Sequence, residues 1–143
     1  MWEYEYAADS TAKPAAVWAV WADVPSWPAW NAGVAEIAVD GRFAPGTRFT
    51  MTPPGEEPIS MQLTEVVPGE RFTDVMDAGD FQVTTVHRLE ALPTGGTRVV
   101  YRTEITGPAA GHVGPELGPA ITADFPDVVA ALCRQAEAVP AAG

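Results

Sequence analysis

The alternation of apolar and polar side chains predicts that most of this chain is β-sheet. Trp2, Tyr4 and Tyr6 alternate with Glu3 and Glu5, which is the period-two pattern of a strand with one face directed inward. The same period returns in the middle of the chain, where glycine and proline residues mark short turns. The strands expected there span residues 34–40, 47–53, 58–67, 71–77, 80–92 and 97–106. Strands joined by short turns pair antiparallel, so these form a meander to which the first strand adds a seventh.

Between the first strand and the meander, the pattern is helical but interrupted. A first short helix carries Trp18 and Trp21 toward the core at a spacing of three residues. Asp23 is expected to cap a second short helix that has Pro25 in its first turn. Pro28 limits how far that helix can run.

After the last strand, apolar residues recur at helical spacing. They are Leu117, Ile121, Phe125, Val128, Val129 and Leu132. Together they form one stripe over about four turns of a long helix near residues 117–138. Pro126 is expected to kink this helix or to lie at a break in it. His112 precedes the stripe and is expected in a solvated loop.

The order of elements predicts an α+β fold. An antiparallel sheet with one apolar face must cover it, and the long C-terminal helix can lie across that face. A curved sheet that grips a helix leaves a gap, which becomes an internal cavity that the two short helices close at one end. We expect a single domain over residues 1–139 and a disordered tail over residues 140–143.

The composition of the chain argues against several classes of binding partner. The net charge of −11 comes from 19 acidic against 8 basic residues, which argues against nucleic acid or an anionic membrane as the main partner. No apolar run approaches the roughly 20 residues of a membrane span, so stable insertion is not expected. The acidic N-terminus does not resemble a signal peptide. Cys133, the single cysteine, excludes an internal disulfide, and a cytoplasmic location is expected.

Four segments carry a resemblance to a known family. They are AKPAAVWAVWADVPSWPAWN (12–31), VVPGERF (66–72), HRLEALPTGGTRVVYRTEITG (87–107) and LGPAI (117–121). In this order they resemble the START-like superfamily (SRPBCC), which has the helix-grip or Bet v 1-like fold. Within it the chain is similar to the bacterial polyketide cyclase/dehydrase and lipid-transport family. The resemblance implies a hydrophobic cavity between the sheet and the long helix, but it implies no single reaction.

Side-chain alternation predicts which residues line that cavity. We expect a mostly apolar pocket of roughly 300–1,000 Å³. The expected lining residues are Trp30, Phe49, Met51, Met61, Leu63, Phe72, Met76, Phe81, Val83, Thr85, Tyr101, Ile121 and Phe125. Between Trp27 and Trp30, the resemblance favours Trp30 as the inward ring.

Three polar residues are candidates for chemistry in the cavity. His87 and Tyr101 lie on the more apolar faces of their strands, and Asp74 shares a face with Phe72 and Met76. A histidine can shuttle protons, a tyrosine hydroxyl can bind a carbonyl oxygen, and a buried carboxyl can act as an acid or orient the histidine. Against this, a lone inward histidine is more often a core residue. Asp74 is better explained as a solvated residue at a strand edge, because the neighbouring Asp77 and Asp80 suggest an acidic rim.

Three functions therefore remain open from the sequence. The first is a binding protein or carrier for a hydrophobic small molecule that is polyketide-, lipid- or aromatic-like. The second is a cofactor-independent polyketide aromatase/cyclase or dehydratase, and the third is an interaction module of the chaperone-activating kind. No metal cluster, nucleophile elbow or dinucleotide fingerprint occurs, so no metal and no cofactor are expected. Cys133 is interpreted as a small core residue, and the oligomeric state stays open.

Overall fold

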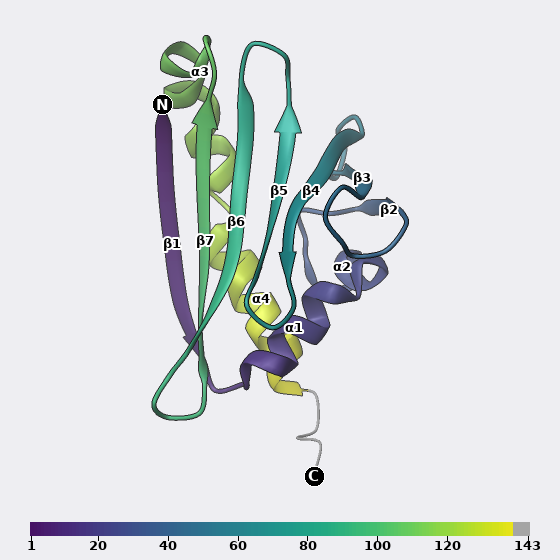
Figure 1. Cartoon of the computed structure of the whole chain (residues 1–143), viewed down its shortest axis with the longest axis vertical. Helices are drawn as coiled ribbons and strands as arrows, with labels where there is room; N and C mark the ends of the chain where they lie inside the picture. The colour runs from purple at the N-terminus through teal and green to yellow at the C-terminus, as the bar shows by residue number, and fades with distance from the viewer. Residues whose placement is uncertain (139–143) are drawn as a thin grey trace.

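The sheet is antiparallel and seven-stranded, in the order β1-β7-β6-β5-β4-β3-β2, and two helical segments lie against its inner face (Figure 1). The computed structural model describes residues 1–138. Its elements are β1 (Trp2–Ser10), α1 (Pro14–Ala22), a 3₁₀ turn η1 (Val24–Ser26), α2 (Trp27–Trp30), β2 (Glu36–Asp40), β3 (Arg48–Thr52), β4 (Ile59–Val67), β5 (Arg71–Asp77), β6 (Gln82–Ala91), β7 (Thr97–Thr106), α3 (Ala110–Thr122) and α4 (Phe125–Ala138). This confirms the predicted helix-grip fold. The expected domain end at residue 139 and the tail 140–143 lie outside the described residues.

Strand register brings distant inner-face residues into rows. Phe72 on β5 is opposite His87 on β6, which is opposite Tyr101 on β7, which is opposite Tyr6 on β1. Side chains directly opposite one another across antiparallel strands lie within contact distance. The register therefore places the histidine and the tyrosine of the sequence prediction side by side on the face that the helices cover.

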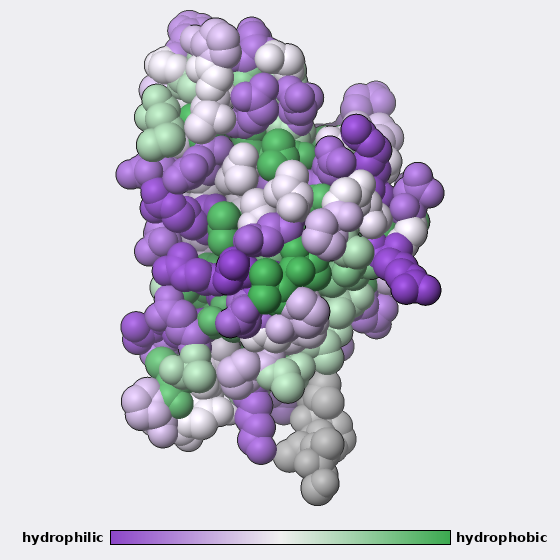
Figure 2. Space-filling view, viewed as in Figure 1, coloured by the Kyte–Doolittle hydropathy of each residue, from purple (hydrophilic) through white to green (hydrophobic). Residues whose placement is uncertain are grey.

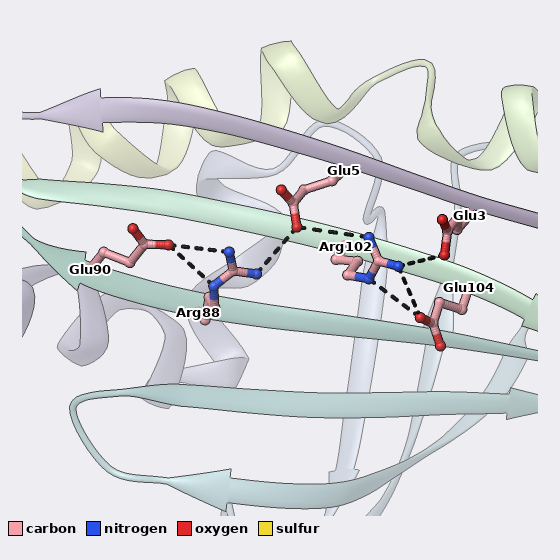
Figure 3. Close-up of polar contacts among 6 residues, drawn as sticks. All are labelled: Glu3, Glu5, Arg88, Glu90, Arg102 and Glu104. Carbon is pink, nitrogen blue, oxygen red and sulfur yellow. Dashed lines mark hydrogen bonds and ion pairs between the residues drawn. The ribbon is translucent and has the colours of Figure 1, made fainter.

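The outer face of the sheet carries the charged residues, as the alternation predicted. Arg102 on β7 forms ion pairs with Glu3, Glu5 and Glu104, and Arg88 on β6 also pairs with Glu5 (Figure 3). Figure 2 shows this face as mostly hydrophilic with small apolar patches between the charges. These side chains are partly exposed, so solvent and salt screen each pair, and the pairs contribute little to the stability of the fold.

The corner after β1 is held by indole groups. Trp21 at the end of α1 is almost fully buried, and its backbone carbonyl accepts a hydrogen bond of 3.0 Å from Trp27 Nε1. The expected cap by Asp23 is wrong, because its side chain makes no capping hydrogen bond. Instead, the carbonyl oxygen of Asp23 accepts a hydrogen bond of 2.7 Å from Ser26 Oγ, which closes the 3₁₀ turn.

The C-terminal helix begins earlier than predicted and consists of two segments. It starts at Ala110, so His112 lies in the first turn of α3 and the expected loop is wrong, although the side chain is exposed. The break falls at Ala123 and Asp124, and Pro126 lies in the first turn of α4. Proline is tolerated in a first turn because its missing N–H has no helical partner there, so Pro126 marks the predicted break.

Trp2 explains two of the glycines in α3. A Cβ added to Gly118 would lie 2.5 Å from the Trp2 ring, and one added to Gly114 would lie 2.5 Å from Trp2 Cβ. The two glycines are four residues apart and so share a helix face. Their missing side chains let α3 approach β1 closely over the indole.

Candidate functional site

A pocket of about 540 Å³ lies between the inner face of the sheet, α2 and the two C-terminal helical segments. Its wall is largely aromatic and includes Trp21, Trp27, Trp30, Phe72, His87, Tyr101 and Phe125. The exposed lining residues are Pro54 and Glu56 in the β3–β4 loop, and Ala120 and Asp124 near the helix break. The mouth of the pocket therefore lies between that loop and the break between α3 and α4.

Most, but not all, of the expected residues line this pocket. Those that do are Trp30, Met51, Met61, Phe72, Met76, Val83, Thr85, Tyr101, Ile121 and Phe125. Phe49, Leu63 and Phe81 do not line it, and this part of the prediction is wrong. Phe49 packs edge-on against Trp27 at 6.0 Å between ring centroids, and Leu63 is sealed in the core. Phe81 precedes β6 and packs in a separate small cluster with Val83 and Ile105.

Both tryptophans of α2 line the pocket, and Trp27 is the deeper of the two. Trp27 is 6% exposed, whereas Trp30 is only half-buried. The Nε1 atom of Trp30 is nonetheless sealed from solvent and lacks a hydrogen-bond partner among the described residues. The prediction that Trp30 faces inward is therefore only part of the picture. Both rings line the pocket, and Trp27 also belongs to the hydrophobic core.

His87 is held as a neutral imidazole. Its ring lies flat on Phe72, with centroids 4.0 Å apart and planes at 5°, and it meets Tyr101 edge to face at 4.6 Å. Its Nδ1 atom lies 3.2 Å from the carbonyl oxygen of Phe72. A carbonyl only accepts, so Nδ1 carries the proton and Nε2 keeps its lone pair. Burial lowers the pKa of His87 to about 3, with the bond to Phe72 opposing the shift, which makes it a weak proton acceptor.

Tyr101 has its hydroxyl hydrogen free for a ligand. The hydroxyl oxygen accepts a hydrogen bond of 3.2 Å from Trp21 Nε1, which is a donor only. The hydroxyl hydrogen has no acceptor among residues 1–138. Burial raises the pKa of Tyr101, partly offset by the bond from Trp21, so the group stays a neutral phenol at physiological pH. Because Tyr101 lines the pocket, its hydroxyl can donate this hydrogen to an oxygen of a ligand.

Asp74, the third candidate, is buried in the wall of the pocket. It lies within β5 opposite Leu63 on β4 and Thr85 on β6, so strands cover it on both sides. It is 5% exposed, and the alternative of a solvated residue at a strand edge is wrong. Thr85, directly opposite, has its hydroxyl 2.9 Å from that of Thr103 and forms no hydrogen bond with Asp74. Burial raises the pKa of Asp74 to about 7.

Several pocket residues were missed by the sequence prediction. Trp21 was assigned to the core alone, yet it lines the pocket and anchors Tyr101. Leu117 and Val128 also line the pocket, and both belonged to the predicted apolar stripe, so the stripe could have identified them as lining residues. Asp124 reaches the pocket only because the helix breaks there, and partial burial raises its pKa. The loop residues at the mouth carry no sequence signal of this kind.

The single cysteine of the chain does not line this pocket. Cys133 is buried in the core, and burial raises the pKa of its thiol. Within residues 1–138, no cluster of three or more histidine, cysteine, aspartate or glutamate side chains is placed to hold a metal ion. In the same part of the chain, no helix combines the length and apolar character needed to cross a bilayer.

Solved structures with the same architecture are distant in sequence. A solution NMR structure of a protein from Thermobifida fusca has a TM-score of 0.78 at 18% identity and covers 98% of this chain and 96% of its own. Ara h 8.0201 has a TM-score of 0.75 at 13% identity, covering 94% and 97%. The di-domain ARO/CYC StfQ from the steffimycin biosynthetic pathway has a TM-score of 0.76 at 15% identity, covering 94% of this chain and 50% of its own. At these identities the likeness shows the fold alone.

Sequence comparison gives the family. Among curated proteins, none matches the chain. The family model described as polyketide cyclase / dehydrase and lipid transport matches residues 1–137. That match spans the sheet, the aromatic corner and nearly all of α4, so it includes every element that forms the pocket. This chain belongs to the polyketide cyclase / dehydrase and lipid transport family.

Proposed function

We propose that the protein binds a hydrophobic small molecule in the pocket between the sheet and the C-terminal helices. The observation that carries this proposal is the pocket itself, whose volume of about 540 Å³ suits a small organic ligand. Three indoles and two phenyl rings give it flat apolar walls. The family and the fold fit a hydrophobic-ligand-binding or polyketide-cyclase role.

The polar groups support binding more directly than catalysis. Tyr101 offers a hydroxyl hydrogen, and His87 offers the lone pair of Nε2. These groups can fix the orientation of a ligand, while the apolar walls provide most of the affinity. A pKa of about 3 makes His87 a poor general base, because a base works best with a pKa near the working pH.

Filling the pocket tests the proposal. Binding of the neutral dye N-phenyl-1-naphthylamine can be followed by its own emission and by quenching of tryptophan fluorescence. Thr85→Phe places a ring in the pocket, whereas Thr84→Phe places the same ring on the outer face of the same strand. We expect saturable binding by the wild type and Thr84→Phe, and a loss of at least about tenfold in affinity for Thr85→Phe. Absence of saturable binding by the wild-type protein would refute the proposal.

A second candidate function rests on Asp74. A carboxyl group with a pKa of about 7 can take or give a proton at neutral pH, and Tyr101 can donate a hydrogen bond to a developing enolate oxygen. This pair suits cyclisation or dehydration of a polyketone, in which a proton leaves a carbon between two carbonyl groups. The test is turnover of a short aromatic polyketone, followed by absorbance. The enzyme proposal requires turnover that falls at least about a hundredfold in Asp74→Asn and is unchanged in Asp40→Asn, whose side chain is exposed.

A further inference from the structure

Asp74 is a buried carboxyl group without a partner. It is 5% exposed, lines the pocket and has no hydrogen-bond partner within residues 1–138. Buried polar groups in folded proteins are almost always hydrogen-bonded, and an unpaired buried carboxylate is costly. No hydrogen bond joins the Asp74 carboxyl group to the described residues, and its oxygens remain accessible from the pocket, so a group that enters the pocket can bind them.

The charged side chains that line the pocket are all acidic. Asp74 lies in its wall, and Glu56 and Asp124 lie at its mouth, while no lysine or arginine of the described chain lines it. The whole chain carries a net charge of −11, which adds to the negative potential. A carboxylate ligand would meet only like charges here. A cation is attracted toward the mouth and finds no competing basic side chain inside.

The groups beside Asp74 also suit a cation. Asp74 and His87 are diagonal neighbours on β5 and β6, because Asp74 is opposite Thr85 and His87 follows two residues later. Such neighbours are roughly 7–8 Å apart at their Cα atoms, so one group between them can reach both. His87 Nε2 is an acceptor, since Nδ1 donates to the Phe72 carbonyl. The faces of indole and phenol rings in the wall, such as Trp21 and Tyr101, add favourable contacts for a positive charge.

We propose that the pocket is selective for a lipophilic amine: an apolar, ring-containing molecule whose ammonium group donates hydrogen bonds to the Asp74 carboxylate and to His87 Nε2. This inference rests on the proposed binding function and names its ligand class. An ammonium group supplies both the charge and the donors that Asp74 lacks. The remainder of the molecule lies against the aromatic wall, and anionic ligands of equal size are excluded.

Three naphthalene probes of equal ring size test the selectivity. They are 1-naphthylmethylamine, 1-naphthalenemethanol and 1-naphthoic acid, titrated by isothermal calorimetry at pH 8. We expect the amine to bind about 10- to 100-fold more tightly than the alcohol, which is the range for a hydrogen bond to a charged group. We expect the acid to bind most weakly. Asp74→Asn should reduce the affinity for the amine to that for the alcohol, whereas Asp40→Asn should behave as the wild type.

The outcomes separate this inference from the function on which it rests. If the alcohol and the amine bind equally, or the acid binds most tightly, the amine selectivity is wrong and the binding function stands. If the preference for the amine survives in Asp74→Asn, the ammonium site is not at Asp74 and the inference fails. If no probe binds the wild type, both proposals fail. Binding of the alcohol by Asp74→Asn shows that the variant is folded, and Asp74→Ser is the second variant if it does not bind.

Discussion

The imidazole of His87 lies flat on the phenyl ring of Phe72, and its Nδ1 donates to the backbone carbonyl of that same residue, 3.2 Å away. One residue on the neighbouring strand therefore fixes both the plane and the tautomer of the histidine. The geometry leaves Nε2 as the one ring nitrogen that can serve a ligand. Burial also favours the neutral form of the ring, because desolvation disfavours a charged imidazolium.

We expect His87→Gln to change the dependence of stability on pH. The folded-state pKa of about 3 lies below the ordinary 6.5, so the neutral ring contributes its full stability above pH 6.5 and loses it as pH falls toward 3. At pH 7, His87→Gln should lower the free energy of unfolding by about 1–3 kcal/mol, through loss of the stack and the hydrogen bond. This deficit should shrink toward pH 4, because glutamine does not titrate. Urea denaturation at several pH values measures it, and a deficit that is constant with pH contradicts the prediction.

We expect Asp74→Asn to change the pH dependence of stability in the opposite direction to His87→Gln. Burial raises the folded-state pKa of Asp74 from 3.8 to about 7, so its contribution is most favourable below pH 3.8 and is lost as pH rises through 7. The other titratable groups that line the same pocket are His87, Tyr101, Glu56 and Asp124. Relative to the wild type, Asp74→Asn should gain up to roughly 4 kcal/mol of unfolding free energy between pH 4 and pH 8, at about 1.4 kcal/mol per pKa unit.

The exposed Asp80 provides the matched control for this prediction. Asp80→Asn changes an exposed side chain, so its free energy of unfolding should stay within about 0.5 kcal/mol of that of the wild type. On folding, Asp74 binds its proton more tightly and His87 binds its proton less tightly. Between about pH 4 and 6.5, their opposite contributions to the pH dependence of the unfolding free energy therefore cancel in the wild-type protein. A difference between Asp74→Asn and the wild type that does not vary with pH would show that Asp74 is hydrated in the folded state.

The faces of the strands were predictable, whereas the depth of Asp74 was not. Strict alternation fixes which side chains share a face, so His87 and Tyr101 were correctly placed inward from their neighbours alone. The same rule placed Asp74 inward. The nearby Asp77 and Asp80 suggested instead that Asp74 is solvated at an acidic rim. That interpretation is wrong because β5 pairs with both β4 and β6, so Asp74 lies in an interior strand of the sheet. Strand order is a long-range property that a local pattern does not contain.

The contacts that complete the site join residues far apart in the sequence. Trp21 and Tyr101 are separated by 80 positions, and no local signal pairs an indole in a helix with a phenol in a strand. Trp2 and Gly118 are likewise brought together only by the docking of α3 on β1. Composition could suggest that the tryptophans form a pocket wall, but the order of depth between Trp27 and Trp30 depends on how the helices close.

The hydrogen bond between Trp21 and Tyr101 should be measurable as a coupling energy. Tyr101→Phe leaves the buried Nε1 of Trp21 without an acceptor, which should cost about 1–3 kcal/mol of unfolding free energy. In a double-mutant cycle with Trp21→Phe, the two residues should be coupled by about 1 kcal/mol. Chemical denaturation of the four proteins gives this value. Strictly additive effects would mean that water or a ligand, and not Trp21, satisfies the tyrosine.

The packing of Trp2 on α3 predicts the effect of Gly118→Ala. Helix propensity and side-chain packing change the stability of this variant in opposite directions. Alanine stabilises a helix interior by roughly 0.5–1 kcal/mol relative to glycine, so propensity alone favours Gly118→Ala. A Cβ there would lie 2.5 Å from the Trp2 ring, closer than carbon atoms approach without displacement. Overpacking of this kind costs about 1–3 kcal/mol, so we expect Gly118→Ala to lower the melting temperature.

Gly111 separates the two effects within the same helix. It is exposed, and a Cβ added to it would have no heavy atom within 4 Å, so only propensity acts there. Gly111→Ala should therefore raise the melting temperature while Gly118→Ala lowers it, both followed by thermal denaturation. In the double variant Trp2→Leu/Gly118→Ala, the smaller side chain makes room for the new methyl group, so the cost of Gly118→Ala should be smaller on the Trp2→Leu background than in the wild type. If both single glycine variants stabilise the protein equally, α3 does not hold the close approach to β1 that brings Leu117, Ala120 and Ile121 to the pocket.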